Sequence, residues 1–146
     1  MSEVRELTGP DIALGYAAMR ELRGEAAPLG SPETFVTWVT AEASRGYRLA
    51  GAFVPDREGA VAVVGFRHFE MLYSGLQLYI DDLSTLPGFR GQGHGRALLS
   101  WAEAEARRLG CQALHLDSAV HRFPAHRLYL GFGFDISAHH FGKKLT

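Results

Sequence analysis

The chain has 146 residues, of which 47% are hydrophobic and 21% charged, and its formal net charge at pH 7 is −1. This length suits one domain with its own core, and the hydrophobic share argues against a disordered chain. The small net charge excludes the basic field that nucleic-acid-binding proteins carry, and no apolar run of about 18 residues predicts a membrane span. We therefore expect a single domain over residues 1–146, with neither nucleic acid nor membrane as a partner.

Two features of the sequence bear on the cellular compartment: the N-terminal segment and the number of cysteines. The stretch from Met1 to Arg5 lacks the apolar core of a secretory signal, and Cys111 is the single cysteine. An internal disulfide is therefore excluded, which favours a reducing, cytoplasmic location.

The first half of the chain predicts two helices between strands. Ile12, Tyr16 and Met19 share one helical face, and Ser31 followed by Pro32 is a typical helix start. The predicted elements are a strand at 4–7, helices at 11–23 and 31–44, and strands at 47–54 and 60–69.

The second half begins with a strand whose alternation fails beside two adjacent carboxylates. Apolar residues alternate from Leu76 to Ile80, but after Asp81 and Asp82 the next apolar residue, Leu83, is one step out of phase. A β-bulge produces such a break. We expect Asp82 to point away from the side that Asp81 faces, unless the bulge rotates it.

A glycine-rich loop, residues 90–96, leads into a helix predicted over 94–109, and a strand at 113–117 follows. The loop reads Arg90-Gly91-Gln92-Gly93-His94-Gly95-Arg96. Glycine lets the backbone approach a bulky anion, and the N–H groups at a helix start attract negative charge. The two arginines can add charge-assisted hydrogen bonds. The loop therefore predicts a phosphate site.

This loop has three alternative interpretations. A nucleoside-triphosphate loop needs Gly-Lys-Ser/Thr, whereas the chain has Gly95-Arg96-Ala97. A dinucleotide-binding fold needs a third glycine where Arg96 stands. A glycine-rich turn without a ligand is the third alternative.

A second motif at residues 124–134, together with the loop, resembles the GCN5-related N-acetyltransferase (GNAT) superfamily. The family's loop pattern, Arg/Gln-x-x-Gly-x-Gly/Ala, is matched by Arg90, Gly93 and Gly95. Its helix pattern, Ala-x-x-Leu/Phe-Tyr-x-x-x-Gly-Phe, is matched by Ala125, Leu128, Tyr129, Gly133 and Phe134. The resemblance covers about residues 76–141, and it departs from the family at Arg122, where an asparagine is common.

The resemblance implies an α/β (α+β) fold with a mixed, mainly antiparallel twisted sheet and helices on both faces. Two neighbouring strands, 76–86 and 113–117, would splay apart around the cofactor, and the tail at 134–145 would be a further strand. The implied cofactor is acetyl-CoA, as co-substrate and without a metal. Its expected contacts are Leu83, Ser84, Thr85, Arg90, Gly91, Gln92, Gly93, His94, Gly95 and Arg96.

The resemblance also implies the catalytic residues. Tyr129 matches the family tyrosine that donates a proton to the departing thiolate; the alternative is a tyrosine that only packs the helix face. Asp81 matches an acid that serves as base; the alternative is that it only positions an ammonium group or completes the bulge. Asp81, Asp117 and Arg122 are expected to line the acceptor side, although the last two also suit a solvated loop.

The predicted function is transfer of an acetyl group from acetyl-CoA to a primary amine of a small molecule, by direct attack in a ternary complex. One alternative is an amino-sugar phosphate N-acetyltransferase, because Gly110-Cys111 and Leu116-Asp117 resemble those enzymes and Arg122 suits a phosphate. The other is a non-catalytic acyl-CoA-binding module. The oligomeric state is left open, with a homodimer as one option.

Overall fold

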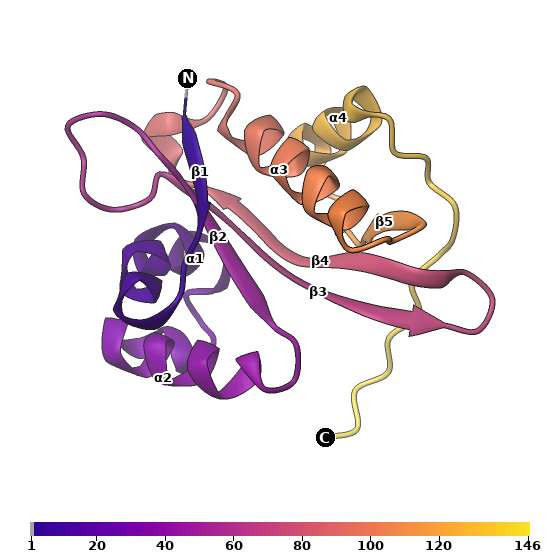
Figure 1. Cartoon of the computed structure of the whole chain (residues 1–146), viewed down its shortest axis with the longest axis horizontal. Coiled ribbons are helices and arrows are strands. Elements are labelled where there is room, and N and C mark those ends of the chain that lie inside the picture. The colour runs from indigo at the N-terminus through magenta and orange to yellow at the C-terminus, as the bar shows by residue number, and fades with distance from the viewer. Residues whose placement is uncertain (1) are drawn as a thin grey trace. The chain divides into compact units, whose positions relative to one another are not determined.

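The structure is a computed structural model that describes residues 2–146. Its helices and strands are β1 (Glu3–Glu6), α1 (Tyr16–Arg23), α2 (Pro32–Ala43), β2 (Arg48–Phe53), β3 (Ala62–Met71), β4 (Gly75–Thr85), α3 (His94–Arg108), β5 (Ala113–Leu116) and α4 (Phe123–Phe132) (Figure 1). Three short 3-10 helices lie at Gly9–Gly15, Ala27–Gly30 and Pro87–Phe89. The chain divides into two compact units, one up to Leu116 and one over Asp117–Thr146. The expectation of a single domain over 1–146 stays a prediction.

The first unit is built on a five-stranded sheet in the order β1-β2-β3-β4-β5. The first four strands are antiparallel to their neighbours, and β5 runs parallel to β4. The predicted fold class, a mixed and mainly antiparallel sheet with helices, is therefore confirmed.

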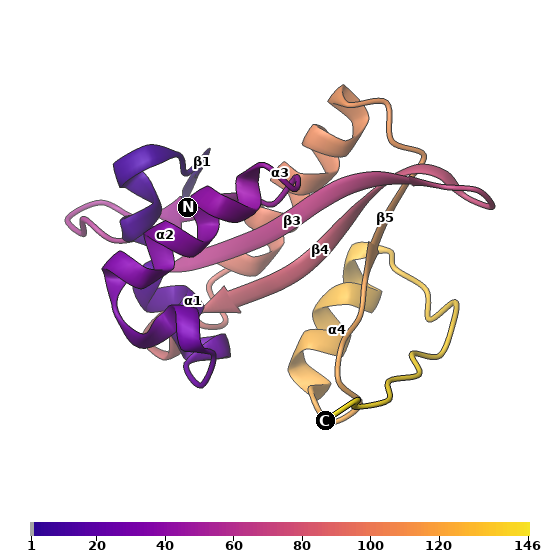
Figure 2. The same cartoon turned by 90° about the horizontal axis from the view of Figure 1, so that it is seen from below.

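Helices cover both faces of this sheet, as the alternation along β2 shows. Leu49 belongs to the core cluster that includes Met19 of α1 and Phe35 of α2. Its neighbour Arg48 lies on the other face, where it pairs with Glu105 of α3. Successive strand residues point to opposite faces, so α1 and α2 pack on one side and α3 on the other (Figure 2).

Two of the predicted elements need correction. The helix expected over 11–23 begins as a 3-10 helix, and α1 starts only at Tyr16. A Cβ on Gly15 would meet Leu7 and Val63 at 3.1 Å, so the chain passes close to the sheet there before the helix proper begins.

The expected strand at 134–145 is wrong: residues 134–146 form neither helix nor strand. Of the tail's large apolar residues, only Phe134 and Ile136 are two positions apart, and Ile136, Phe141 and Leu145 are exposed. They therefore give no apolar face on which a strand would pack.

The predicted bulge in β4 is confirmed. Gly65 of β3 is opposite Asp82, and the next β3 residue, Phe66, is opposite Ile80, so Asp81 has no partner of its own. The extra residue disturbs the alternation of side chains, which is why the sequence pattern fails there.

The parallel pair β4–β5 is short. Its register runs from Gln77 opposite Ala113 to Ile80 opposite Leu116, where β5 ends, whereas β4 continues to Thr85. The β4 backbone from Asp81 onward therefore has no β5 neighbour, and the two strands diverge (Figure 2). No helix in the described part of the chain is long and apolar enough to cross a bilayer.

Candidate functional site

The glycine loop has the conformation that a phosphate site needs. Gly91 and Gly93 have φ of 74° and 89°, in the left-handed region that favours glycine. α3 begins at His94, and its first intrahelical bond runs from Ala97 N–H to the Gly93 carbonyl, 3.0 Å. The earlier N–H groups of the turn have no acceptor within the helix. A Cβ on Gly91 or Gly93 would meet nothing within 4 Å, so the space in front of both is open.

Side chains around the loop hold it to the rest of the first unit. Arg90 donates from Nε to the Thr85 carbonyl at 3.4 Å and pairs with Glu21 of α1 at 3.1 Å. Gln92 donates to the Gly88 carbonyl at 3.4 Å. These bonds tie the loop to the end of β4 and to α1.

His94 is an unusual member of the loop because it is buried. Its side chain packs edge-on against Phe89, with ring centroids 6.2 Å apart, and neither ring nitrogen has a partner among the described residues. Burial lowers the pKa of His94 below its ordinary value of 6.5. The ring is therefore neutral at physiological pH and adds no charge to the loop.

The end of β4 lies between the loop and α1. Ser84 is buried, and its hydroxyl donates to the Ala18 carbonyl of α1 at 2.7 Å. Leu83 and Thr85, on either side, are half-buried. Ser84 thus fixes α1 on the sheet, while Leu83 and Thr85 keep partly accessible side chains.

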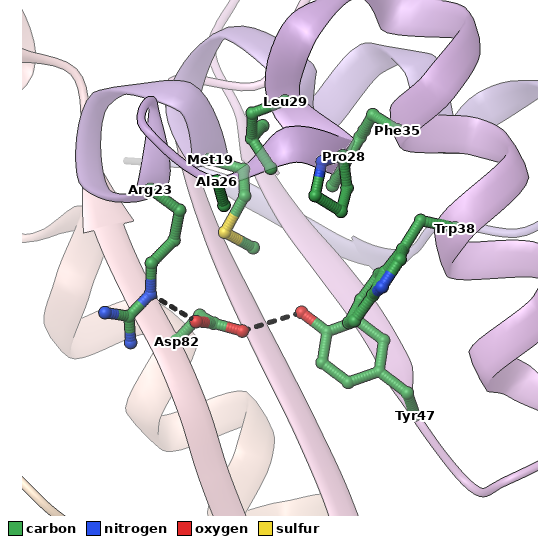
Figure 3. Close-up of a pocket in the computed structure, with 9 residues that line it drawn as sticks. All are labelled: Met19, Arg23, Ala26, Pro28, Leu29, Phe35, Trp38, Tyr47 and Asp82. Carbon is green, nitrogen blue, oxygen red and sulfur yellow. Dashed lines mark hydrogen bonds and ion pairs between the residues drawn. The ribbon is translucent and has the colours of Figure 1, made fainter. Parts of the chain in front are cut away.

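The two carboxylates at the bulge have different partners. Asp81 accepts hydrogen bonds from Arg67 of β3, the shortest being 2.6 Å. Asp82 accepts from Arg23 of α1 at Oδ1 and from the Tyr47 hydroxyl at Oδ2, each at 2.8 Å (Figure 3). Each carboxylate is therefore paired with an arginine of its own, Asp81 with Arg67 and Asp82 with Arg23.

These five residues, Arg23, Tyr47, Arg67, Asp81 and Asp82, form one network, which we call the bulge network. The Arg67 guanidinium lies 5.5 Å from the centre of the Tyr47 ring, and Arg23 also donates to the Asp81 carbonyl at 3.1 Å. The bulge therefore rotates Asp82 into the network that holds Asp81, rather than away from it.

Burial dominates the electrostatics of the bulge network. It raises the pKa of Asp81 above its ordinary value of 3.8, and Arg67 opposes that rise. Burial and the neighbouring Asp82 raise the pKa of Tyr47 well above its ordinary value of 10.0. The phenol therefore stays protonated and remains a hydrogen-bond donor to Asp82.

A cavity of about 340 Å³ opens beside Asp82 (Figure 3). Trp38 packs edge-on against Tyr47 there, with ring centroids 5.2 Å apart. The residues that line the cavity are Met19, Arg23, Ala26, Pro28, Leu29, Phe35, Trp38, Tyr47 and Asp82. The carboxylate is predicted from the sequence, but the aromatic and apolar walls are not, because they come from separate elements and carry no local motif.

The second unit holds the other predicted site residues. Tyr129 of α4 is half-buried and packs against Phe134, with ring centroids 5.9 Å apart. Burial raises the pKa of Tyr129 above its ordinary value of 10.0, and Arg122 opposes that rise. Asp117 lies 3.7 Å from His140. The roles assigned to Tyr129, Asp117 and Arg122 stay predictions.

Within residues 2–146, no group of three or more histidine, cysteine, aspartate or glutamate side chains is placed to hold a metal ion.

Comparison with known proteins points to one family. A family model described as Acetyltransferase (GNAT) family matches residues 15–134. An aminoalkylphosphonate N-acetyltransferase from Salmonella typhimurium is 44% identical over 66 residues, which are 45% of this chain and 43% of that protein. The chain thus matches less than half the length of this relative.

Solved structures agree on the fold. A ribosomal-protein-alanine N-acetyltransferase from Brucella melitensis biovar Abortus 2308 has a TM-score of 0.82 at 15% identity, with 100% of both chains covered. AAC(6')-Iy, solved in complex with a bisubstrate analogue of CoA, has a TM-score of 0.81 at 10% identity, with 100% of this chain and 99% of that one covered.

Proposed function

The chain belongs to the GNAT family of acetyltransferases, and we propose that it transfers the acetyl group of acetyl-CoA to the primary amine of a small molecule. The observation that carries the proposal is the glycine loop. Gly91 and Gly93 have positive φ and lie in the turn just before α3, and a Cβ on either would meet nothing within 4 Å. The loop follows the end of β4, which is no longer paired with β5. The amine as acceptor is supported by the partial relative, whose name is that of an N-acetyltransferase.

The pyrophosphate of CoA would lie against the loop. The backbone N–H groups from Gln92 to Arg96 would bind it, and Arg90 would support the turn. Because no β5 residue pairs with the β4 backbone beyond Ile80, the peptide groups of Leu83 and Thr85 that point away from β3 would face the pantetheine arm and the thioester, while those of Ser84 pair with β3. No metal takes part in this scheme.

Amide formation needs two proton transfers. The amine acceptor has a pKa of about 10 and is mostly protonated at neutral pH, so a proton must leave before its lone pair attacks. The nitrogen then bonds to the thioester carbonyl carbon, the carbon–sulfur bond breaks, and CoA leaves as a thiolate. Asp81 is proposed as the base that takes the amine proton, directly or through one water. Its raised pKa suits that role better than an unperturbed carboxylate would.

Tyr129 is proposed as the donor that protonates the departing thiolate. Its pKa lies above 10.0, so the phenol carries its proton throughout the physiological range. A protonated phenol in contact with the leaving sulfur would return CoA as the neutral thiol. Asp117 and Arg122 are proposed to contact the acceptor.

A second candidate acceptor carries an anionic group as well as an amine. It is favoured by the partial relative named as acting on aminoalkylphosphonates. An amino-sugar phosphate would belong to the same chemical class, with Arg122 as the cation that meets it.

The proposal is tested by calorimetry with CoA and by the release of free thiol from acetyl-CoA over a panel of primary amines. We expect CoA to bind and at least one amine to release thiol. CoA binding without thiol release from any amine would instead identify a non-catalytic acyl-CoA-binding module.

The first testable prediction is that Gly93→Val abolishes measurable CoA binding. The residue has φ of 89°, which a β-branched side chain does not tolerate, and its side chain would occupy the open space where the pyrophosphate would lie. Gly88→Val is the matched control, because a Cβ on Gly88 also meets nothing within 4 Å but its φ is not positive. Equal affinity of both variants for CoA in calorimetry would contradict the proposed cofactor site.

A further inference from the structure

We propose that the cavity beside Asp82 is the acceptor site and that it selects a primary monoamine with an apolar, ring-sized body, such as an arylalkylamine. The ammonium group would lie against Asp82 and the apolar body against the cavity wall. This inference rests on the proposed function, and it assigns to Asp82, Trp38 and Tyr47 the binding of the substrate.

The wall of the cavity is the first argument. Two thirds of the lining residues are apolar, and they surround the single carboxylate of Asp82. The apolar residues are Met19, Ala26, Pro28, Leu29, Phe35 and Trp38. A concave apolar surface with a few convergent polar groups is the usual form of a small-molecule site, and about 340 Å³ lies at the small end of that class.

The charge of the bulge network is the second argument. Asp82 is balanced by Arg23 and Asp81 by Arg67, so the formal charges of the network sum to zero. Net charge therefore does not attract a cation here, and the single carboxylate that lines the cavity has no counterpart for a second or third ammonium group. The cavity does offer one ammonium group a carboxylate, because each oxygen of Asp82 accepts one hydrogen bond and a carboxylate oxygen has a second lone pair.

The same contacts argue against an anionic acceptor. Arg23 is the cation among the lining residues, and its Nε is bound to Asp82. A phosphonate or phosphate in the cavity would face the apolar wall and the Asp82 carboxylate, and it would share Arg23 with Asp82 and the Asp81 carbonyl.

The backbone shows that the polar end of the cavity is built for these two side chains. A Cβ on Gly65 would lie 1.9 Å from the Tyr47 hydroxyl oxygen and 2.9 Å from Asp82 Oδ2. The phenol and the carboxylate therefore occupy the space that any other residue at the bulge would fill. The Tyr47 hydroxyl fixes one oxygen of Asp82, and Asp82 lines the cavity.

Trp38 allows the inference to be tested by fluorescence. The chain has two tryptophans, and Trp101 lies on α3, where it packs against Phe66 on the opposite face of the sheet. In a Trp101→Phe background the signal comes from Trp38 alone. Phenylethylamine, spermidine, aminoethylphosphonate and the uncharged phenylethanol are titrated separately, with and without CoA, which cannot acylate them.

We expect a saturable change of the Trp38 signal with phenylethylamine at concentrations well below those needed for the other three compounds. Asp82→Asn should weaken phenylethylamine binding by about tenfold or more, because a charge-assisted hydrogen bond is lost. Asp56→Asn, in the exposed loop after β2, is the matched control and should bind normally.

Several outcomes would overturn the inference. Tighter binding of spermidine or of aminoethylphosphonate than of phenylethylamine would refute the selection of an apolar monoamine, and these comparisons need no variant at the site. No saturable signal from any amine, in a protein that binds CoA and releases thiol, would refute the cavity as acceptor site and leave the proposed function standing. A Trp38 response in a protein that neither binds CoA nor releases thiol would refute the proposed function instead.

Discussion

Gly65 shows how one residue without a side chain makes room for a polar contact. It lies at the register shift of the bulge, and its missing Cβ leaves space for the Tyr47 hydroxyl and the Asp82 carboxylate. The contact is buried enough to keep the phenol protonated. A substitution here acts on geometry rather than on charge.

We predict that Gly65→Ala weakens amine binding and destabilises the fold by about 1–3 kcal/mol, the usual range for overpacking. The new methyl group would displace the Tyr47 hydroxyl and separate it from Asp82. Gly30→Ala is the matched control, since a Cβ there meets nothing within 4 Å and φ is not positive. Urea unfolding and the Trp38 titration measure both effects, and a variant that binds amine as tightly as wild type would contradict the role given to Gly65.

At Tyr129, we predict that Tyr129→Phe lowers the turnover number by about 10²–10⁴-fold, the usual contribution of one general acid. The ring and its packing against Phe134 remain, so only the proton donor is lost. CoA affinity should change little. Because burial raises the pKa of Tyr129, wild-type activity should not fall from loss of this proton below about pH 10. Unchanged turnover in the variant, where chemistry limits the rate, would remove Tyr129 from the mechanism.

For the two carboxylates, we predict that Asp81→Asn and Asp82→Asn fail in different ways. Asp81→Asn should lower kcat most at lower pH, where free amine is scarce, and recover partly as the pH rises. Asp82→Asn should mainly raise KM for the amine, because in our proposal the Asp82 carboxylate binds the ammonium group. A pH–rate profile of each variant measures this. Loss of kcat in Asp81→Asn by the same factor at every pH would assign that residue to positioning instead of proton transfer.

At the scale of elements, α3 is held to the sheet by a buried carboxylate. Glu105 forms ion pairs with Arg108 on its own helix and with Arg48 of β2. Arg48 also forms an ion pair with Glu6 of β1, the neighbouring strand, at 2.7 Å. Hydrogen bonds from Arg108 and Arg48 hold the pKa of Glu105 at about 2, below its ordinary value of 4.5. Most exposed ion pairs contribute little, but the Glu105 carboxylate is almost fully buried and its partner Arg48 is largely buried, whereas Arg108 is exposed.

We predict that Glu105 stabilises the fold at neutral pH and loses this effect in acid. A carboxyl whose pKa is lower in the folded chain contributes stability above its unfolded pKa, and the contribution is lost as the pH falls from about 4.5 toward about 2. One pKa unit is about 1.4 kcal/mol, so the contribution stays below about 3.5 kcal/mol, and solvent screening of the exposed Arg108 lowers it further. Urea unfolding of Glu105→Gln at neutral and acid pH measures it.

Glu103→Gln is the control for this prediction, because Glu103 pairs with Arg107 on the exposed side of the same helix at 2.7 Å. Glu103→Gln should change the free energy of unfolding little at any pH. If both variants lost the same free energy of unfolding at neutral pH, the buried ion pairs of Glu105 would stabilise the fold no more than the exposed pair of Glu103.

The elements also show what local sequence encodes. Ser31 was predicted to begin a helix, and its hydroxyl accepts from Thr34 N–H at 3.1 Å at the start of α2. The bulge can be predicted because apolar residues alternate along a strand that buries one face, and Leu83 is one position out of phase with that alternation. The strand expected over 134–145 rested on the family resemblance, and beyond Ile136 the tail's apolar residues show no alternation that would support a strand.

At the scale of the molecule, the glycine loop could be predicted and the cavity could not. The loop is a continuous stretch whose function depends on local backbone conformation. The cavity is lined from α1, the segment before α2, α2, the residue before β2, and β4. Each of these contributes one to three side chains, and most of them look like ordinary core residues in the sequence. Only folding brings Trp38, Tyr47 and Asp82 together.

Helix α1 contributes to both proposed sites of the first unit, the glycine loop and the cavity. Its Met19 and Arg23 line the cavity, Glu21 pairs with Arg90 of the glycine loop, and Ser84 fixes the Ala18 carbonyl between them. A displacement of α1 that one ligand requires therefore changes the free energy with which the other binds. Thermodynamic linkage makes that coupling reciprocal: whatever factor CoA imposes on the affinity for the amine, the amine imposes on the affinity for CoA.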